Sequence, residues 1–190
     1  NWGAAAVEGG TPGRANSVRS TRTAPLILDV AHAPAIPTSR EPVTIRARLV
    51  SAESADMQAV LHYRADGAGE FTSLAMPKDR LYRAEIPPQG DGTVVEFYIE
   101  AADGAGHSRT WPAPSLVDGA LRQATNALYI VDDSFDQQTS HTPGAHPVYY
   151  LIMTDSERTE LDQIGDEQYS GDLFAAEPMS DAQMNATFIS

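Results

Sequence analysis

The run Thr93-Val94-Val95-Glu96-Phe97-Tyr98-Ile99-Glu100-Ala101-Ala102 carries the clearest structural signal in this sequence. Apolar residues occupy every second position from Val95 to Ala101, and charged or hydroxyl-bearing residues stand between them. Side chains on a β-strand point alternately to opposite faces, so one set is directed into a core and the other toward water. The pattern predicts a long, half-buried strand at the centre of a sheet.

Shorter runs on both sides of this one repeat the alternation. They span residues 26–30, 43–49, 58–64, 71–76, 82–86 and 108–111. Turn signals rich in Gly, Pro and Asp separate them, and Pro112 and Pro114 end the last run because proline cannot donate a ladder hydrogen bond. About seven short strands at this spacing predict an all-β, immunoglobulin-like β-sandwich over residues 25–115, which we expect to fold alone.

Residues 25–115 resemble a fibronectin type III or related immunoglobulin-like module of bacterial extracellular proteins. The segment Phe97-Tyr98-Ile99-Glu100-Ala101-Ala102-Asp103-Gly104-Ala105-Gly106 resembles the penultimate strand and exit turn of that family. In many members a tyrosine begins this motif, and its hydroxyl bonds back to the chain. Phe97 stands at that place here, so the hydroxyl is absent and Tyr98 is expected to point outward.

The composition argues against several classes of function. The 190 residues carry 13 Lys and Arg against 26 Asp and Glu, a formal net charge of −13. A nucleic-acid binder needs a concentrated basic face, and docking on anionic lipid needs a basic surface as well. The excess of acidic residues therefore argues against both functions. No apolar run approaches the ~20 residues of a membrane-spanning helix. The chain has no cysteine, which excludes disulfides, thiolate zinc sites and cysteine nucleophiles.

The charge is unevenly distributed along the chain. Residues 1–24 hold three basic residues and one acidic residue, residues 25–115 hold eight and twelve, and residues 116–190 hold two and thirteen. This asymmetry divides the chain into regions of different character. We expect an acidic linker over 116–146, with a short strand at 127–131, and a further α+β unit over 147–190.

The N-terminal region has its own family resemblance. Asn1-Trp2-Gly3, a short spacer and Gly9-Gly10-Thr11-Pro12-Gly13-Arg14-Ala15-Asn16-Ser17 resemble the closing segment of a bacterial lamin-tail domain. That family is an immunoglobulin-like sandwich of bacterial surface and secreted proteins. The resemblance implies that residues 1–24 are the end of such a domain together with a linker.

The last region reads as strand, helix and strand. Val148–Met153 has a strong strand pattern, and Thr154 with Glu157 three residues later forms a capping box that opens a helix. Gly165 is expected to end that helix as a left-handed cap. The pattern of residues 183–189 predicts the next strand.

This unit resembles the N-terminal edge of a CotH (spore coat protein H) family domain. The residues that carry the resemblance are Pro147-Val148-Tyr149-Tyr150-Leu151-Ile152-Met153-Thr154, the short helix and Met184-Asn185-Ala186-Thr187-Phe188-Ile189. The resemblance implies a parent protein with an atypical protein-kinase-like fold that uses ATP and a divalent metal; some relatives are surface adhesins. The family's nucleotide lysine, catalytic aspartate and metal-binding aspartate lie downstream. We therefore expect residues 1–190 to be an inactive slice of a longer exported protein.

Other polar residues favour structural roles. The histidines at 32, 62 and 107 lack the i+2 or i+4 partner of a metal pair and are expected at the surface. Arg46 and Arg48 predict a cross-strand charge ladder with Arg64 or Glu85, with an anion or glycan site as the alternative. The aspartates at 132, 133 and 136 do not have EF-hand spacing, which favours a solvated linker over a calcium site.

Aromatic residues leave a binding function open. An aromatic platform for sugar stacking would use Tyr63, Tyr82, Tyr98 and Trp111. The alternation favours a core position for the first two of these. We assign no catalytic, cofactor-binding or metal-binding residue within the chain.

Three functions remain. The first is a non-catalytic segment of a bacterial CotH-type kinase protein, located outside the cell or at its surface, with the sandwich as a spacer or presenting module and the downstream kinase-like domain as its partner. The second is a surface adhesion or glycan-binding sandwich. The third is an architectural spacer in another exported enzyme.

Overall fold

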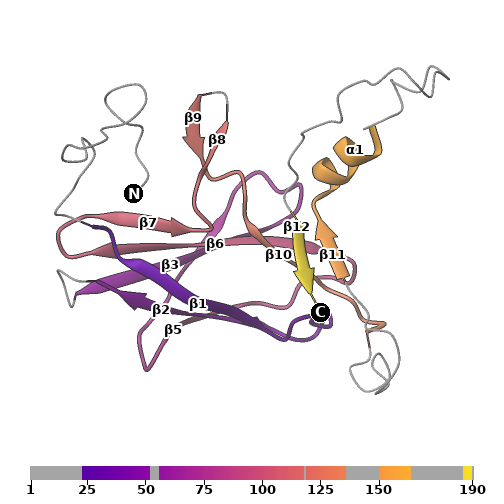
Figure 1. Ribbon diagram of the computed structural model, residues 1–190. Helices are drawn as coiled ribbons and strands as arrows, with labels where there is room; N and C mark the ends of the chain where they lie inside the picture. The colour runs from indigo at the N-terminus through magenta and orange to yellow at the C-terminus, as the bar shows by residue number, and fades with distance from the viewer. Residues whose placement is uncertain (1–22, 52–55, 118, 136–149, 164–185, 190) are drawn as a thin grey trace, which may run out of the picture.

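The computed structural model describes residues 23–51, 56–117, 119–135, 150–163 and 186–189. It is an all-β sandwich of two antiparallel sheets with a small strand–helix–strand unit at one side (Figure 1). The first sheet has the order β1-β2-β5, with strands Leu26–Ala33, Val43–Val50 and Tyr82–Ile86. The second has the order β10-β6-β3-β4, with strands Ala127–Ile130, Val94–Asp103, Met57–Ala65 and Thr72–Ala75. The expected sandwich is therefore confirmed.

The predicted central strand is β6, and its alternation divides its side chains as expected. Phe97 and Ile99 lie in the core with at most 1% of their surface exposed, and Tyr98 points to the outer face of the second sheet. The register places Phe97 opposite Tyr63 of β3 on one side and Ala127 of β10 on the other. Because β6 pairs along both of its edges, it organises the whole second sheet.

A tyrosine hydroxyl links the two sheets, but it does not come from position 97, where this chain has a phenylalanine. The hydroxyl of Tyr82, on β5, donates to the backbone carbonyl of Met57, on β3, at 3.0 Å. Tyr82 is otherwise buried in the core. This bond ties the first sheet to the second across the interior, because β5 and β3 belong to different sheets.

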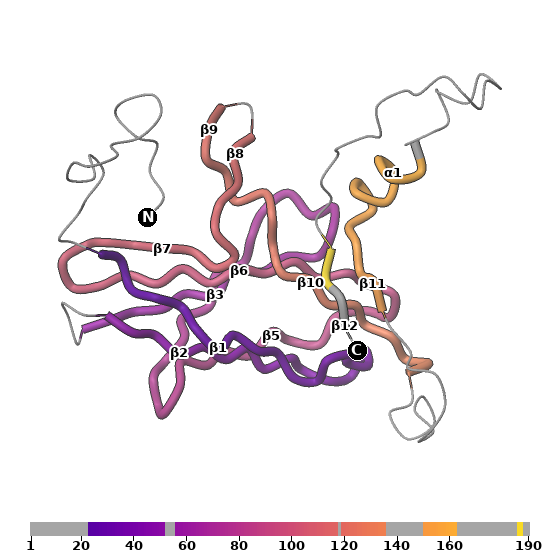
Figure 2. The backbone as a smooth tube through the Cα atoms, in the orientation of Figure 1, coloured from indigo at the N-terminus to yellow at the C-terminus, as the bar shows by residue number. Residues whose placement is uncertain are grey.

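The last strand of the sandwich is divided into two pieces. Trp111, at the end of β7 (Ser108–Trp111), lies opposite Ile99, and Ala127, at the start of β10, lies opposite Phe97. Both pieces run antiparallel to β6, so β10 continues the line of β7 after an excursion over residues 112–126. That excursion carries the hairpin β8 (Ser115–Val117) and β9 (Ala120–Arg122), which projects from the sandwich (Figure 2).

The sandwich therefore extends beyond residue 115, where the sequence placed its end. The strand expected inside an acidic linker is β10, which pairs with β6 and buries Tyr129 in the core. Val131, the residue that follows β10, is 1% exposed and packs in the same core. A solvated linker would not contribute fully buried residues, so residues 127–131 belong to the sandwich.

The strand–helix–strand unit agrees with the sequence pattern. Strand β11 (Tyr150–Met153) pairs antiparallel with β12 (Ala186–Ile189), and helix α1 (Asp155–Gln163) follows β11 directly. Thr154 begins the helix as predicted, since its Oγ1 accepts the backbone N–H of Glu157 at 3.3 Å. Gly165 and the segment that resembles a lamin-tail domain lie outside the described residues. No helix in the described ranges is both long and apolar enough to cross a membrane.

Candidate functional site

The candidate site is the junction between the sandwich and the strand–helix–strand unit. Strand β10 has apolar side chains on both faces: Tyr129 points into the sandwich core, and Leu128 and Ile130 point out of it. Leu128 is nevertheless fully buried, because it packs with Val94 of β6 and Ile152 of β11 in a second apolar cluster. We call this cluster and the bonds around it the junction.

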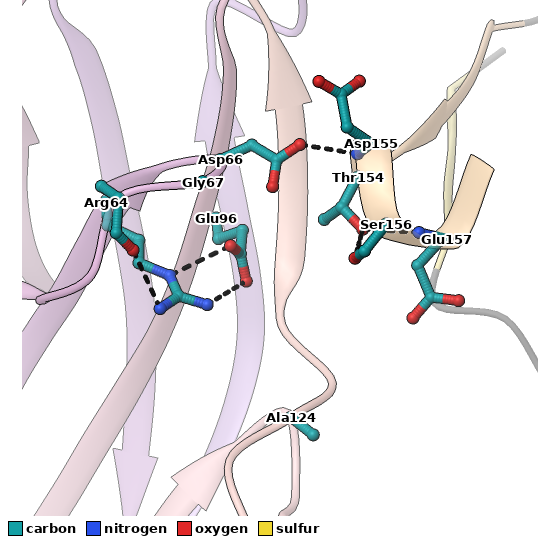
Figure 3. Close-up of a pocket in the computed structure, with 10 residues that line it drawn as sticks. Arg64, Asp66, Gly67, Glu96, Ala124, Thr154, Asp155, Ser156 and Glu157 are labelled. Carbon is teal, nitrogen blue, oxygen red and sulfur yellow. Dashed lines mark hydrogen bonds and ion pairs between the residues drawn. The ribbon is translucent and has the colours of Figure 1, made fainter. Parts of the chain in front are cut away.

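Two hydrogen bonds hold the junction. The backbone N–H of Leu128 donates to Oγ1 of Thr187 on β12 at 3.0 Å. Asp66, in the turn after β3, accepts the backbone N–H of Asp155 at 2.7 Å through its carboxylate (Figure 3). The first N–H groups of a helix have no partner within the helix and favour a negative charge. The sandwich therefore supplies a carboxylate at the start of α1.

A polar pocket of about 360 Å3 lies beside this contact (Figure 3). Arg64 on its wall donates from Nε and Nη2 to the two carboxylate oxygens of Glu96, at 3.0 and 3.3 Å. Asn126 donates a further bond to Glu96 at 2.9 Å. The Glu96 side chain is 5% exposed, so its negative charge is held by partners and not by water. Arg64, Glu96 and Asn126 therefore satisfy one another.

Sequence reasoning missed the parts of the junction that come from the sandwich. The run Ala127-Leu128-Tyr129-Ile130-Val131 has no polar position, which is the pattern of a strand covered on both faces. That signal could have indicated Leu128. No local signal indicates that Asp66, 89 residues away, caps the helix at Asp155.

The four aromatic residues considered for sugar stacking do not share a face. Tyr82 is buried, and Tyr63 packs against the same core, as the alternation predicted. Tyr98 lies on the outer face of the second sheet, where its ring stacks on His62 with centroids 4.5 Å apart. Trp111 lies at the edge of the sandwich, beside Phe97. A single platform built from these residues is therefore excluded.

The histidines are half-buried and partnered, and not simply at the surface as expected. His107 contacts the Asp103 carboxylate at 3.0 Å, and His62 contacts the Ser73 hydroxyl at 2.9 Å. His32 contacts the backbone carbonyl of Ala35 at 3.1 Å, and burial lowers its pKa. Within the described ranges, no group of three or more His, Asp or Glu side chains is arranged to hold a metal ion.

The expected charge ladder is absent from the first sheet. Arg46 lies opposite Arg83, and Glu85 lies opposite Thr44. Arg48 pairs instead with Asp29, at 2.6 Å from Nε to the carboxylate. The sequence could not place these residues because alternation indicates the face of a residue and not its neighbour on the next strand.

The two described aspartates of the cluster after β10 serve as structural acceptors. Asp132 accepts the N–H and the hydroxyl of Ser134, and Asp133 accepts those of Ser39. The N–H of Ser39, followed by its hydroxyl, lowers the pKa of Asp133. Asp136 lies outside the described residues. The calcium interpretation gains no support from this arrangement.

Comparison with known proteins was largely negative. No family model matches the chain, and no curated protein matches it. Among solved structures, the chain is similar to the solution NMR structure of a lipoprotein from Bacteroides thetaiotaomicron. The two are 14% identical, with a TM-score of 0.35, over 68% of this chain and 95% of that one. The functional argument therefore comes from the residues of the junction.

Proposed function

We propose that this chain is a non-catalytic N-terminal segment of an exported, multidomain bacterial protein of the CotH type. In this proposal the sandwich acts as a platform that holds the first strand, helix and second strand of the following domain in a fixed position. The parent is then an atypical protein kinase located outside the cell or at its surface, and its reactive groups lie beyond this segment.

The observation that carries the proposal is the burial of Leu128 on the outer face of β10. A spacer joined to its neighbour only by a linker would leave that face in water, and an outward-pointing leucine would be exposed. Leu128 is fully buried beneath Ile152, and both belong to one apolar cluster. Burial of a leucine side chain stabilises such a contact by about 2 kcal/mol, enough to favour the docked arrangement.

The contacts also restrain orientation. The apolar cluster fixes β11 against β10, and the Asp66 carboxylate holds the start of α1. Two separate points of attachment restrict rotation about either one. A platform of this kind would present the following domain in a defined direction.

Within the described residues, the groups needed for phosphoryl transfer are not assembled at one site. Such transfer needs a positioned lysine, metal ligands and a base around the phosphates. Lys78 is the only lysine of the sequence, and its ammonium lies over the ring of Tyr82, 5.8 Å from the centroid.

A matched pair of substitutions on β11 tests the platform. Ile152 is 4% exposed in the junction, and its neighbour Leu151 is 64% exposed on the opposite face. Ile152→Asp should accelerate amide hydrogen exchange across residues 150–163 of the full chain while β2 and β6 stay protected, because a charge cannot remain in the apolar cluster. Leu151→Asp should leave exchange unchanged. Equal effects of the two substitutions would show that the unit is only tethered.

The non-catalytic part of the proposal has a separate test. The chain is incubated with labelled ATP and Mg²⁺, and transfer to the chain itself, to casein and to water is measured. We expect no transfer above a buffer blank. Transfer that persists after repurification would contradict the proposal.

A further inference from the structure

A second cavity lies at the edge of the sandwich, at the point along β6 where its pairing changes from β7 to β10. It has a volume of about 370 Å3, and its walls come from β1, β6, β7, β10 and β12. The residues used in the argument are Ala31, His32, Phe97, Trp111 and Thr187. Binding sites for small molecules typically have volumes of about 300–1,000 Å3 and occur between structural units. This cavity meets both conditions.

The cavity is neutral in a strongly acidic chain. The formal net charge of the sequence is −13, yet the residues that line this cavity within the described ranges include no Asp, Glu, Lys or Arg. A charged ligand would lose its hydration here without gaining an ion pair. The lining therefore selects an uncharged ligand.

Aromatic rings form much of the wall. The Phe97 and Trp111 centroids are 6.5 Å apart, and the His32 ring lies 6.1 Å from Phe97. Phe97 is 1% exposed and fixed in the core. Indole rings offer a broad, rigid apolar surface at low entropic cost, which suits stacking against a flat ligand face.

Two polar atoms remain available beside these rings. The Nε2–H of His32 donates to the carbonyl of Ala35, so Nδ1 is left as an acceptor, and it has no hydrogen-bond partner in the described part of the chain. Thr187 accepts the N–H of Leu128 through Oγ1, which leaves its own hydroxyl proton free to donate. His32 thus offers the cavity an acceptor, and Thr187 offers it a donor.

We infer that this cavity binds a neutral pyranose ring, such as a terminal sugar of a surface glycan. The C–H face of a pyranose is apolar and stacks on an aromatic ring, and its hydroxyls both donate and accept hydrogen bonds. A wholly apolar ring would leave His32 and Thr187 without partners, at a cost in affinity. This ligand-binding role goes beyond the platform role, although Thr187 belongs both to the cavity and to the junction.

The binding test uses Trp111 as the reporter. Trp2 and Trp111 are the two tryptophans of the sequence, so Trp2→Phe leaves a single one at the cavity. The full chain with this substitution is titrated with the methyl glycosides of glucose, galactose, mannose and N-acetylglucosamine, and with cyclohexanol and glucuronate as apolar and charged rings. At least one neutral glycoside should change Trp111 emission saturably, with a Kd of about 1 mM, the range expected for one small ring.

Two variants locate the binding, with ligand-detected NMR as the readout. Ala31→Leu adds side-chain volume at the cavity wall, and Trp111→Ala removes the stacking surface; each should weaken binding about tenfold or more. Tyr98→Ala, on the outer face of the second sheet, should leave binding unchanged. Circular dichroism verifies that each variant is folded, and Ala31→Leu leaves the indole of Trp111 present.

Several results would overturn the inference. Among the ligands, these results are no response to any neutral glycoside, or binding of cyclohexanol or glucuronate that is as tight or tighter. Among the variants, they are full binding by folded Ala31→Leu, or loss of binding in Tyr98→Ala. None of these results bears on the exchange experiment at Ile152, so failure of this inference leaves the platform proposal standing.

Discussion

Leu128 and Thr187, 59 residues apart in the chain, are joined by a 3.0 Å hydrogen bond from the backbone N–H of the first to the side-chain oxygen of the second. Leu128 lies on β10, whose other face is covered by the sandwich core. One short strand is therefore shared by two structural units. The stability of each unit depends on the other through this strand.

The first prediction concerns Thr187. Thr187→Val removes the acceptor while keeping the shape of the side chain, so a buried N–H loses its partner at a cost of about 1–3 kcal/mol. We expect the free energy of opening at the Leu128 amide, measured by hydrogen exchange, to fall by that amount. Thr187→Ser keeps the oxygen and should lose much less. Unchanged protection in the valine variant would show that the bond contributes nothing.

The second prediction concerns the end of the sandwich. A fragment of residues 23–115 lacks β10 and with it Leu128 and Tyr129, both fully buried. We expect this fragment to unfold without a cooperative transition, and a fragment of residues 23–135 to unfold in one cooperative step in urea. The comparison uses circular dichroism and tryptophan fluorescence together. A cooperative transition of the shorter fragment would restore the boundary expected from the sequence.

The third prediction concerns Arg64 and Glu96. Arg64→Met keeps most of the side-chain volume but leaves a carboxylate that is 5% exposed without its main counter-charge. We expect a loss of about 3 kcal/mol in the free energy of unfolding. The double variant Arg64→Met, Glu96→Leu should recover much of that loss, because the unpaired charge is gone. The single variant Glu96→Leu completes the comparison. If the loss in the double variant equals the sum of the losses in the two single variants, the pair is not coupled.

The fourth prediction concerns pH. The backbone N–H of His107, followed by its imidazole and by the N–H of Ala105, holds the pKa of Asp103 below its ordinary value. A lowered folded-state pKa contributes stability above the unfolded pKa of about 3.9, and this contribution is lost as the pH falls through the folded value. Asp103→Asn keeps an acceptor oxygen and cannot titrate. Its stability should fall less steeply than that of the unsubstituted chain below about pH 4.

The measurement for Asp103 is urea unfolding from about pH 2 to pH 6 in both proteins. Parallel curves would show that Asp103 does not carry the acid sensitivity. The comparison with Asn is informative because its side-chain oxygen can still accept the N–H groups of Ala105 and His107. The substitution changes the charge and the contact of Oδ2 with the His107 imidazole.

Much of the fold could be predicted from alternation alone. The run around Phe97 indicated the central strand, and Thr154 with Glu157 indicated the start of α1. Both are local signals: period-two burial and a cap three residues from its partner arise within a few residues of chain. Tyr98 pointed outward for the same reason.

The candidate site could not be predicted in this way. The pattern predicts a charge ladder of Arg46 with Arg64 or Glu85, but Arg46 lies opposite Arg83. It predicts a linker around Leu128, which lies on β10 and pairs with β6. Strand pairing and burial at the junction join residues far apart in sequence. Their local patterns are compatible with many partners.

The sequence alone determined which residues form strands, which faces of those strands are apolar and where the helix begins, because these follow from side-chain chemistry over short distances. The tertiary structure decided that Leu128 is covered by Ile152, that Asp66 caps Asp155, and that Trp111 borders an uncharged cavity. Those relationships depend on which segments meet once the whole core has packed, and packing is a property of the complete arrangement and not of any one segment.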